Sequence, residues 1–226
     1  MVDWMVEVTS VFKCTERTFF LAVAIMDSYY GKRKEALPEE DLHLTGVTCM
    51  FLASKYEDIE HITMSALVKR IAHDCFTKEQ VKAKEKDILR TLGMSLHLLL
   101  SFDFIHNFSL CFRTHTPAEE ESQRFIAKKA TMLLRMAVHD EAYLHLKRGL
   151  LGSACVYASF VFERKRRAVE GGESDVDKAL VYWTKLVVKT TPFSIDEIEE
   201  KAKKLVYFQD RFSEWLPEAN IYKFLQ

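Results

Sequence analysis

Glycine and proline are scarce in this 226-residue chain, which holds only 7 Gly and 4 Pro. No Asn-Gly or Asp-Gly pair marks a β-hairpin turn, and no stretch sustains the apolar–polar alternation of a half-buried strand. The hydrophobic residues instead recur with a helical period, as in the set Trp4, Met5, Val8, Val11 and Phe12. Because this spacing places apolar side chains on one face of a helix, we expect an all-α protein.

Cysteines are too few and too scattered to form a disulfide framework. Their number is odd, no Cys-x-x-Cys pair occurs, and some lie inside apolar runs such as residues 47–53. Buried, reduced thiols are typical of intracellular proteins, so we expect a location in the nucleus, the cytoplasm or both. The five are Cys14, Cys49, Cys75, Cys111 and Cys155.

Long hydrophobic runs are missing as well. The longest apolar stretches, residues 19–26 and 149–162, are shorter than the roughly 20 residues that a membrane helix needs, so we expect no membrane partner. No secretory signal peptide is recognisable at the start of the chain. The helical pattern already begins at Val2, and we therefore expect native residues to precede Met1.

Neither sign of charge is in surplus, since 32 Lys and Arg face 33 Asp and Glu for a net charge of -1. A protein whose main partner is nucleic acid needs a surplus of cations or a concentrated basic patch, so we expect no direct nucleic-acid partner. The one dense basic run is residues 164–167. We interpret it as a solvated helix end, with a nuclear-localisation or anion-binding patch as the alternative.

Signatures of catalysis and of metal binding are also missing. The histidines show no metal-ligand spacing, and there is no Gly-rich phosphate loop and no Gly-x-Ser-x-Gly motif. The carboxylate clusters at residues 119–121 and 140–141 lie at predicted helix N-termini, where negative charge favours the helix dipole. We therefore expect a protein that is not an enzyme, with no metal and no cofactor.

Helix starts are marked by capping boxes, in which a Ser or Thr and the residue three positions later satisfy each other's backbone amides. The three boxes pair Thr77 with Gln80, Thr116 with Glu119, and Ser194 with Glu197. With the apolar period, they predict ten helices at residues 1–13, 16–30, 39–56, 63–73, 77–91, 102–113, 117–138, 141–166, 174–189 and 194–208.

Two segments recur in the same order, about half a chain apart. Residues 46–51 resemble residues 152–157, because in each a Gly is followed three positions later by a Cys, an aliphatic residue and an aromatic residue. Residues 76–81 likewise resemble residues 193–198 and share their capping box. The repetition predicts a duplicated five-helix unit, with Gly46 and Gly152 on the central helices. The predicted domains are residues 1–99 and 100–213, followed by a C-terminal tail at 214–226.

Five segments, taken in order, resemble the cyclin family. Residues 2–8 and 21–27 resemble the first and second helices of the cyclin box. Residues 42–58 are similar to its third helix, the family's most diagnostic segment, and residues 76–92 to its fifth. Residues 144–162 resemble part of the second cyclin box of the cell-cycle cyclins. The resemblance implies two tandem five-helix cyclin boxes.

The resemblance also implies a function. Residues 54–58 look most like those of the mitotic A- and B-type cyclins. Such proteins are regulatory subunits that bind and activate a cyclin-dependent serine/threonine protein kinase and so control cell-cycle progression. They hold the kinase's C-helix where its Glu meets the ATP-binding Lys. The implied partner is therefore a kinase catalytic subunit, in a heterodimer.

Lys55 and Glu85 match the two cyclin residues that hydrogen-bond kinase backbone beside the C-helix. An ammonium donates to carbonyls, and a carboxylate accepts from amides. Without the resemblance, they would be read as a solvated Lys and an ordinary helical Glu. Met94 stands where the family often has an aromatic residue, and a core role is an equal alternative for Phe76. The other matching kinase contacts are Leu52, Tyr56, Glu57, Asp58, Ile59, Phe76, Leu89, Met94 and Leu96.

Four residues match the family's substrate-docking patch, which takes Arg-x-Leu-type motifs of kinase substrates and inhibitors. They are Trp4, Glu7, Leu42 and His43. A Gln is more usual where His43 stands, and the patch normally begins upstream of Met1. The resemblance therefore implies substrates and inhibitors with Arg-x-Leu-type motifs as partners, for a patch that has His43 in place of Gln and lacks its upstream part.

Two other functions remain open. A cyclin-fold general transcription factor would use the same tandem bundles to bind DNA, and it predicts a basic face and a Cys-rich zinc ribbon, neither of which is evident in the sequence. A scaffold cyclin would bind a kinase without activating it.

Overall fold

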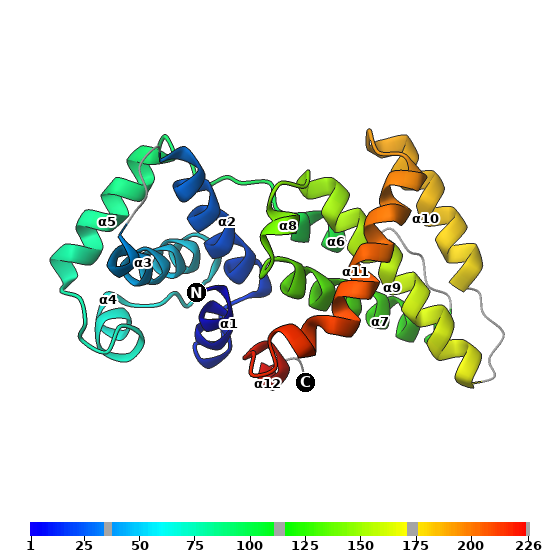
Figure 1. The fold of residues 1–226 in the computed structure, drawn as a ribbon, viewed down its shortest axis with the longest axis horizontal. Helices are drawn as coiled ribbons and strands as arrows, with labels where there is room; N and C mark the ends of the chain where they lie inside the picture. The colour runs from blue at the N-terminus through cyan, green and yellow to red at the C-terminus, as the bar shows by residue number, and fades with distance from the viewer. Residues whose placement is uncertain (34–37, 111–115, 171–175, 225–226) are drawn as a thin grey trace. The chain divides into compact units, whose positions relative to one another are not determined.

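The computed structural model describes residues 1–33, 38–110, 116–170 and 176–224. Within these residues every regular element is a helix, so the expected all-α class is confirmed (Figure 1). The chain divides into two compact units, Met1–Leu98 together with Asn220–Gln226, and Leu99–Ala219. None of the described helices is both long and apolar enough to span a bilayer.

The first unit is built around one central helix. Its elements are α1 (Val2–Val11), α2 (Glu16–Lys32), α3 (Glu39–Glu57), α4 (Met64–Ala66), the π-helical turn η1 (Leu67–Ile71), α5 (Lys78–Thr91) and the short α12 (Ile221–Phe224). Helix α3 packs against α2, α5 and η1, and α12 packs against α1 (Figure 1). Residues 45–54 of α3 are all buried, and exposure begins at Lys55. A helix segment that is surrounded in this way needs apolar or small side chains on every face.

The second unit repeats this plan around α9. Its elements are α6 (Ser101–Leu110), α7 (Pro117–Ala137), the one-turn α8 (Glu141–Leu144), α9 (Arg148–Glu170), α10 (Val176–Thr190) and α11 (Ile195–Trp215). Helix α9 packs against α6, α7, α10 and α11. Gly46 lies on α3 and Gly152 on α9, so both glycines occupy the central helices that the sequence predicted.

All three predicted capping boxes are present. Thr77 caps α5 with Gln80, Thr116 caps α7 with Glu119, and Ser194 caps α11 with Glu197. In each box the hydroxyl accepts from the amide three residues on, at 3.2 Å. These starts were predictable because both partners of a box lie within one turn of chain.

The single helix predicted at residues 141–166 is wrong, because the chain forms α8, turns, and starts α9 at Arg148. Asp140 Oδ1 accepts from the Ala142 amide at 2.9 Å and begins α8. The turn that follows leaves Tyr143 buried, with its ring 5.4 Å from that of Phe208 on α11. The packing of Tyr143 therefore accounts for the break between α8 and α9, which no Pro or Gly in residues 145–147 indicates.

Three other ends differ from prediction. Helix α9 continues to Glu170 and α11 to Trp215, and residues assigned to a C-terminal tail form α12. The helix ends predicted at residues 113 and 174 lie outside the described residues. Cys111 also lies outside them, and the other four cysteines are free thiols, of which Cys49 and Cys155 are buried on the central helices.

Candidate functional site

Lys55 and Glu85 form an ion pair that joins α3 to α5. The Lys55 Nζ donates directly to Glu85 Oε1. The ammonium also lies 4.3 Å from the centre of the Phe51 ring, which fixes it at the end of α3. The two side chains are 34% and 17% exposed, so each keeps a free face with hydrogen-bonding capacity to spare. The structure thus brings together two residues that stand 30 positions apart.

The neighbouring carboxylates face inward instead. Glu57 pairs with Arg17 of α2. Asp58 Oδ1 accepts from the Thr15 amide at 3.1 Å and from the Thr18 hydroxyl at 2.6 Å. These bonds tie the end of α3 to the start of α2. Glu57 and Asp58 therefore hold the site in place and offer little surface of their own.

Exposed apolar side chains follow both members of the Lys55–Glu85 pair along the chain. Tyr56 is 50% exposed, Ile59 is fully exposed, and Met94 is 71% exposed on a residue with a φ of 61°. Left-handed backbone is uncommon for a non-glycine residue, so Met94 is held outward by the turn after α5. Leu89 and Leu96 are half-buried.

Leu52 is 3% exposed and lies in the core of the first unit. It cannot present a surface to a partner, so its place is one of support beneath the exposed side chains. The sequence could not separate these two roles, because α3 is apolar on every face along most of its length.

Two of the four residues matched to the substrate-docking patch, Trp4 and His43, form an aromatic row with Phe76. The Trp4 and His43 rings lie 5.5 Å apart edge to face, and the His43 and Phe76 rings 5.2 Å apart. Leu42, the residue before His43, is 37% exposed. Burial, together with the charge of His73, lowers the pKa of His43, which favours the neutral imidazole. The structure thus places Phe76 against His43, in one row with Trp4.

The C-terminal segment reaches Glu7, which the sequence did not predict. The Asn220 amide donates to Asp3 Oδ2 at 3.0 Å, and its Nδ2 donates to Glu7 Oε2 at 3.4 Å. Ile221 next to it is fully buried. These contacts join residues more than 200 positions apart, which no local pattern reveals.

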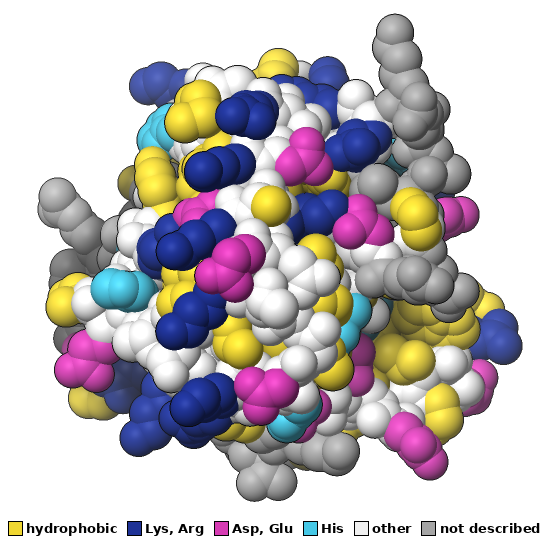
Figure 2. Space-filling view, turned by 90° about the vertical axis from the view of Figure 1, so that its left-hand side faces the viewer, with side chains coloured by type: hydrophobic (Ala, Val, Ile, Leu, Met, Phe, Trp, Pro, Cys, Tyr) yellow, Lys and Arg dark blue, Asp and Glu magenta, His cyan; other side chains and the backbone are white. Residues whose placement is uncertain are grey.

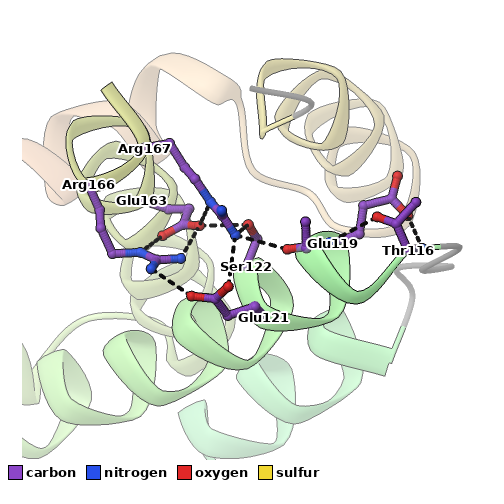
Figure 3. Close-up of polar contacts among 8 residues, drawn as sticks. Thr116, Glu119, Glu121, Ser122, Glu163, Arg166 and Arg167 are labelled. Carbon is purple, nitrogen blue, oxygen red and sulfur yellow. Dashed lines mark hydrogen bonds and ion pairs between the residues drawn. The ribbon is translucent and has the colours of Figure 1, made fainter. Parts of the chain in front are cut away.

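The basic run at residues 164–167 is only partly the solvated helix end that the sequence predicted. Arg164 and Lys165 are exposed near the end of α9, but Arg166 and Arg167 hold a buried carboxylate (Figure 3). Glu163 has no exposed side-chain surface. It accepts from Arg166 Nε at 2.7 Å, from Arg167 Nε at 3.0 Å and from the Ser122 hydroxyl at 2.6 Å. Glu121 of α7 completes the cluster through Arg166 at 2.8 Å. The run therefore fastens α9 to α7.

The geometry has clear matches among known proteins. Residues 1–97 match the family described as the cyclin N-terminal domain. Cyclin-B2-1 of Oryza sativa subsp. japonica is 29% identical over 159 residues, 70% of this chain and 35% of that protein. The G2/mitotic-specific cyclin-B3 of Drosophila melanogaster is 24% identical over 203 residues, 88% and 31% respectively. The chain spans about a third of the length of these relatives.

Two solved structures share the fold. The viral cyclin of herpesvirus saimiri matches with a TM-score of 0.65 and 19% identity, over 91% of this chain and 85% of that one. A chain of the CAK complex of Chaetomium thermophilum bound to ATP-gamma-S matches with a TM-score of 0.61 and 13% identity, over 99% and 66%.

Residues 1–97 thus match the N-terminal domain of the cyclin family, and the chain as a whole is similar in sequence to named cyclins and in fold to a viral cyclin. Among cyclins it resembles the B-type mitotic cyclins. Its relatives are named as G2/mitotic-specific cyclins, which are proteins of the cell cycle.

Proposed function

We propose that this protein is the regulatory subunit of a cyclin-dependent serine/threonine kinase, and that it activates the kinase without performing chemistry itself. The observation that carries the proposal is the Lys55–Glu85 pair, held between two helices with a free face on each side chain. A preformed ammonium and carboxylate offer a donor and an acceptor side by side to kinase backbone. Exposed Tyr56, Ile59 and Met94 supply apolar area near the ends of the same helices.

Such a surface would activate a kinase by population shift. A cyclin that binds the active position of the kinase C-helix better than the inactive one shifts the equilibrium by its differential affinity. The Glu of the kinase C-helix then pairs with the Lys that binds the ATP phosphates. Free thiols, two of them buried, fit an intracellular protein, so we propose a location in the nucleus, the cytoplasm or both.

The test is the affinity of a cyclin-dependent kinase catalytic subunit for Lys55→Ala and Glu85→Ala variants. Each change should weaken binding by about 2 kcal/mol or more, because charged hydrogen-bond partners buried at an interface are lost. Glu85→Lys should be worse, since it places a second cation against Lys55. Circular dichroism checks that the fold is intact.

The matched control is Lys84→Ala. Lys84 also joins α5 to α3, through Asp41 Oδ2 at 2.5 Å, but its partner lies near the start of α3, whereas Lys55 lies near the end. Affinity should be unchanged in that variant. If Lys55→Ala and Glu85→Ala bind like the parent, the proposed interface is wrong, and the likeness to cyclins would concern architecture alone.

A second function, docking of Arg-x-Leu-type segments, is favoured by the contact of Trp4 with His43, since Glu7 lies three residues after Trp4 on the same helix. An apolar row next to a carboxylate suits a peptide with a leucine and an arginine. Titration with a fluorescent Arg-x-Leu peptide should give binding that Trp4→Ala abolishes. Equal binding by parent and variant would remove this function.

A cyclin-fold transcription factor remains the alternative. It would show sequence-specific binding to duplex DNA at nanomolar concentration, which the balanced charge of the chain does not favour.

A further inference from the structure

The outer face of α5 carries a row of four cations at a spacing of four residues. Lys78, Lys82, Lys86 and Arg90 are all exposed. Figure 2 looks onto the face of the first unit where α5 lies and shows Lys and Arg side chains gathered on it. We call this row the α5 basic row.

These cations are unpaired within the part of the chain that the structure describes. Helix α5 has three carboxylates of its own, but two of them are engaged elsewhere. Glu85 pairs with Lys55, and Asp87 pairs with Arg33 at 2.9 Å. Of the three, only Glu79 is exposed and has no ion pair among the described residues. The outer face therefore carries four positive charges against one negative charge.

Most of the row does not stabilise the helix that bears it, and only Arg90, in the last turn, complements the helix dipole. Like charges at a spacing of four residues repel one another on a helix surface. Lys78 also lies in the first turn, next to the positive end of the helix dipole. Apolar packing by Val81 and Ile88 holds the opposite face, so the fold tolerates the row without needing it.

We propose that the α5 basic row binds an extended acidic segment of a partner protein. Along the helix the cations follow each other about every 6 Å, over about 18 Å in total. Side chains that point the same way on an extended peptide repeat about every 6.6 Å. A segment of roughly seven residues with a carboxylate at every second position therefore matches the row, charge for charge.

Charge balance favours a peptide over a polyanion of larger extent. Duplex DNA and anionic membranes are bound by basic fields that extend over many contacts. The whole chain has a net charge of -1, and the row is one helix wide. A short acidic segment needs no more than the row provides.

The test is fluorescence anisotropy of an octapeptide of alternating Glu and Ser, titrated with the full chain at about 0.15 M ionic strength, where the Debye length is about 8 Å. The charge reversal Lys82→Glu with Lys86→Glu should weaken binding by about tenfold or more, because two attractions become repulsions. The matched control is Lys185→Glu with Lys189→Glu, two exposed lysines four residues apart on α10. It should bind within about twofold of the parent, since these lysines lie outside the row.

Competition decides between partner classes. A short mixed-sequence duplex and phosphatidylserine vesicles are added at equal concentrations of negative charge. The proposal stands if the peptide competes better than either. It is overturned if the duplex or the vesicles compete better, if both double variants lose binding equally, or if the parent shows no binding. The assay contains no kinase, so its result is independent of the proposed activation.

Discussion

Gly152 controls how closely α9 approaches α6. A Cβ at this position would lie 2.6 Å from the Ser101 carbonyl oxygen and 2.8 Å from the Phe104 Cβ. Both atoms belong to or adjoin backbone, so neither can move aside cheaply. The absence of a side chain therefore permits the central helix of the second unit to be surrounded.

Replacing Gly152 by Ala should destabilise the protein by about 1–3 kcal/mol, the usual cost of overpacking. Urea denaturation measures the change. Gly31→Ala is the control, because a Cβ there meets no atom within 4 Å and Ala favours the helix. If both variants have the same stability, the close approach of α6 and α9 is not what the glycine provides.

Helix α9 is held to α7 by the cluster around Glu163. Burial alone would raise the pKa of the Glu163 carboxyl, but hydrogen bonds from Arg166, Ser122 and Arg167 outweigh it and hold the pKa below its usual value. A depressed pKa means that the folded state favours the charged carboxylate. Its contribution to stability is therefore complete above the unfolded pKa and is lost as the pH falls through the folded pKa.

Glu163→Gln should cost about 2 kcal/mol or more at neutral pH, because two arginines lose their shared buried carboxylate. Because Gln has no carboxyl group to protonate, the free energy of unfolding of the variant should fall less than that of the parent as the pH is lowered. Stability measured by urea denaturation between neutral and acid pH checks both points. Equal acid sensitivity in parent and variant would contradict the assigned role.

The elements differ in how far the sequence alone reveals them. Capping boxes such as Thr77 with Gln80 were predictable, because both partners are local. The role of Arg166 was not, since its partner Glu121 lies 45 residues away on another helix. The contact of Lys55 with Glu85 likewise spans 30 residues, so only likeness to a known family pointed to the pair. Which apolar residues stay exposed, as Met94 does, depended on tertiary packing.

The C-terminal helix α12 packs against the N-terminal helix α1. Residues from Asn220 onward belong with the first unit. Ile221 is fully buried there. The first unit is therefore incomplete without the last residues of the chain.

Ile221→Ala should destabilise the first unit by about 2–4 kcal/mol, because a buried side chain is truncated and a cavity remains. Hydrogen exchange should rise at the amides of α1, while the amides of α10 in the second unit serve as the internal control. Unchanged protection of α1 would contradict the assignment of the C-terminal residues to the first unit.

Kinase activation by this chain can be measured as phosphate transfer to a substrate. Purified catalytic subunits from a panel of cyclin-dependent kinases are assayed with and without the full chain. We expect the chain to raise the activity of at least one of them, the Lys55→Ala, Glu85→Ala double variant to fail to do so, and Lys84→Ala to succeed. Binding without any gain in activity, or equal activation by the double variant, would contradict the proposed function.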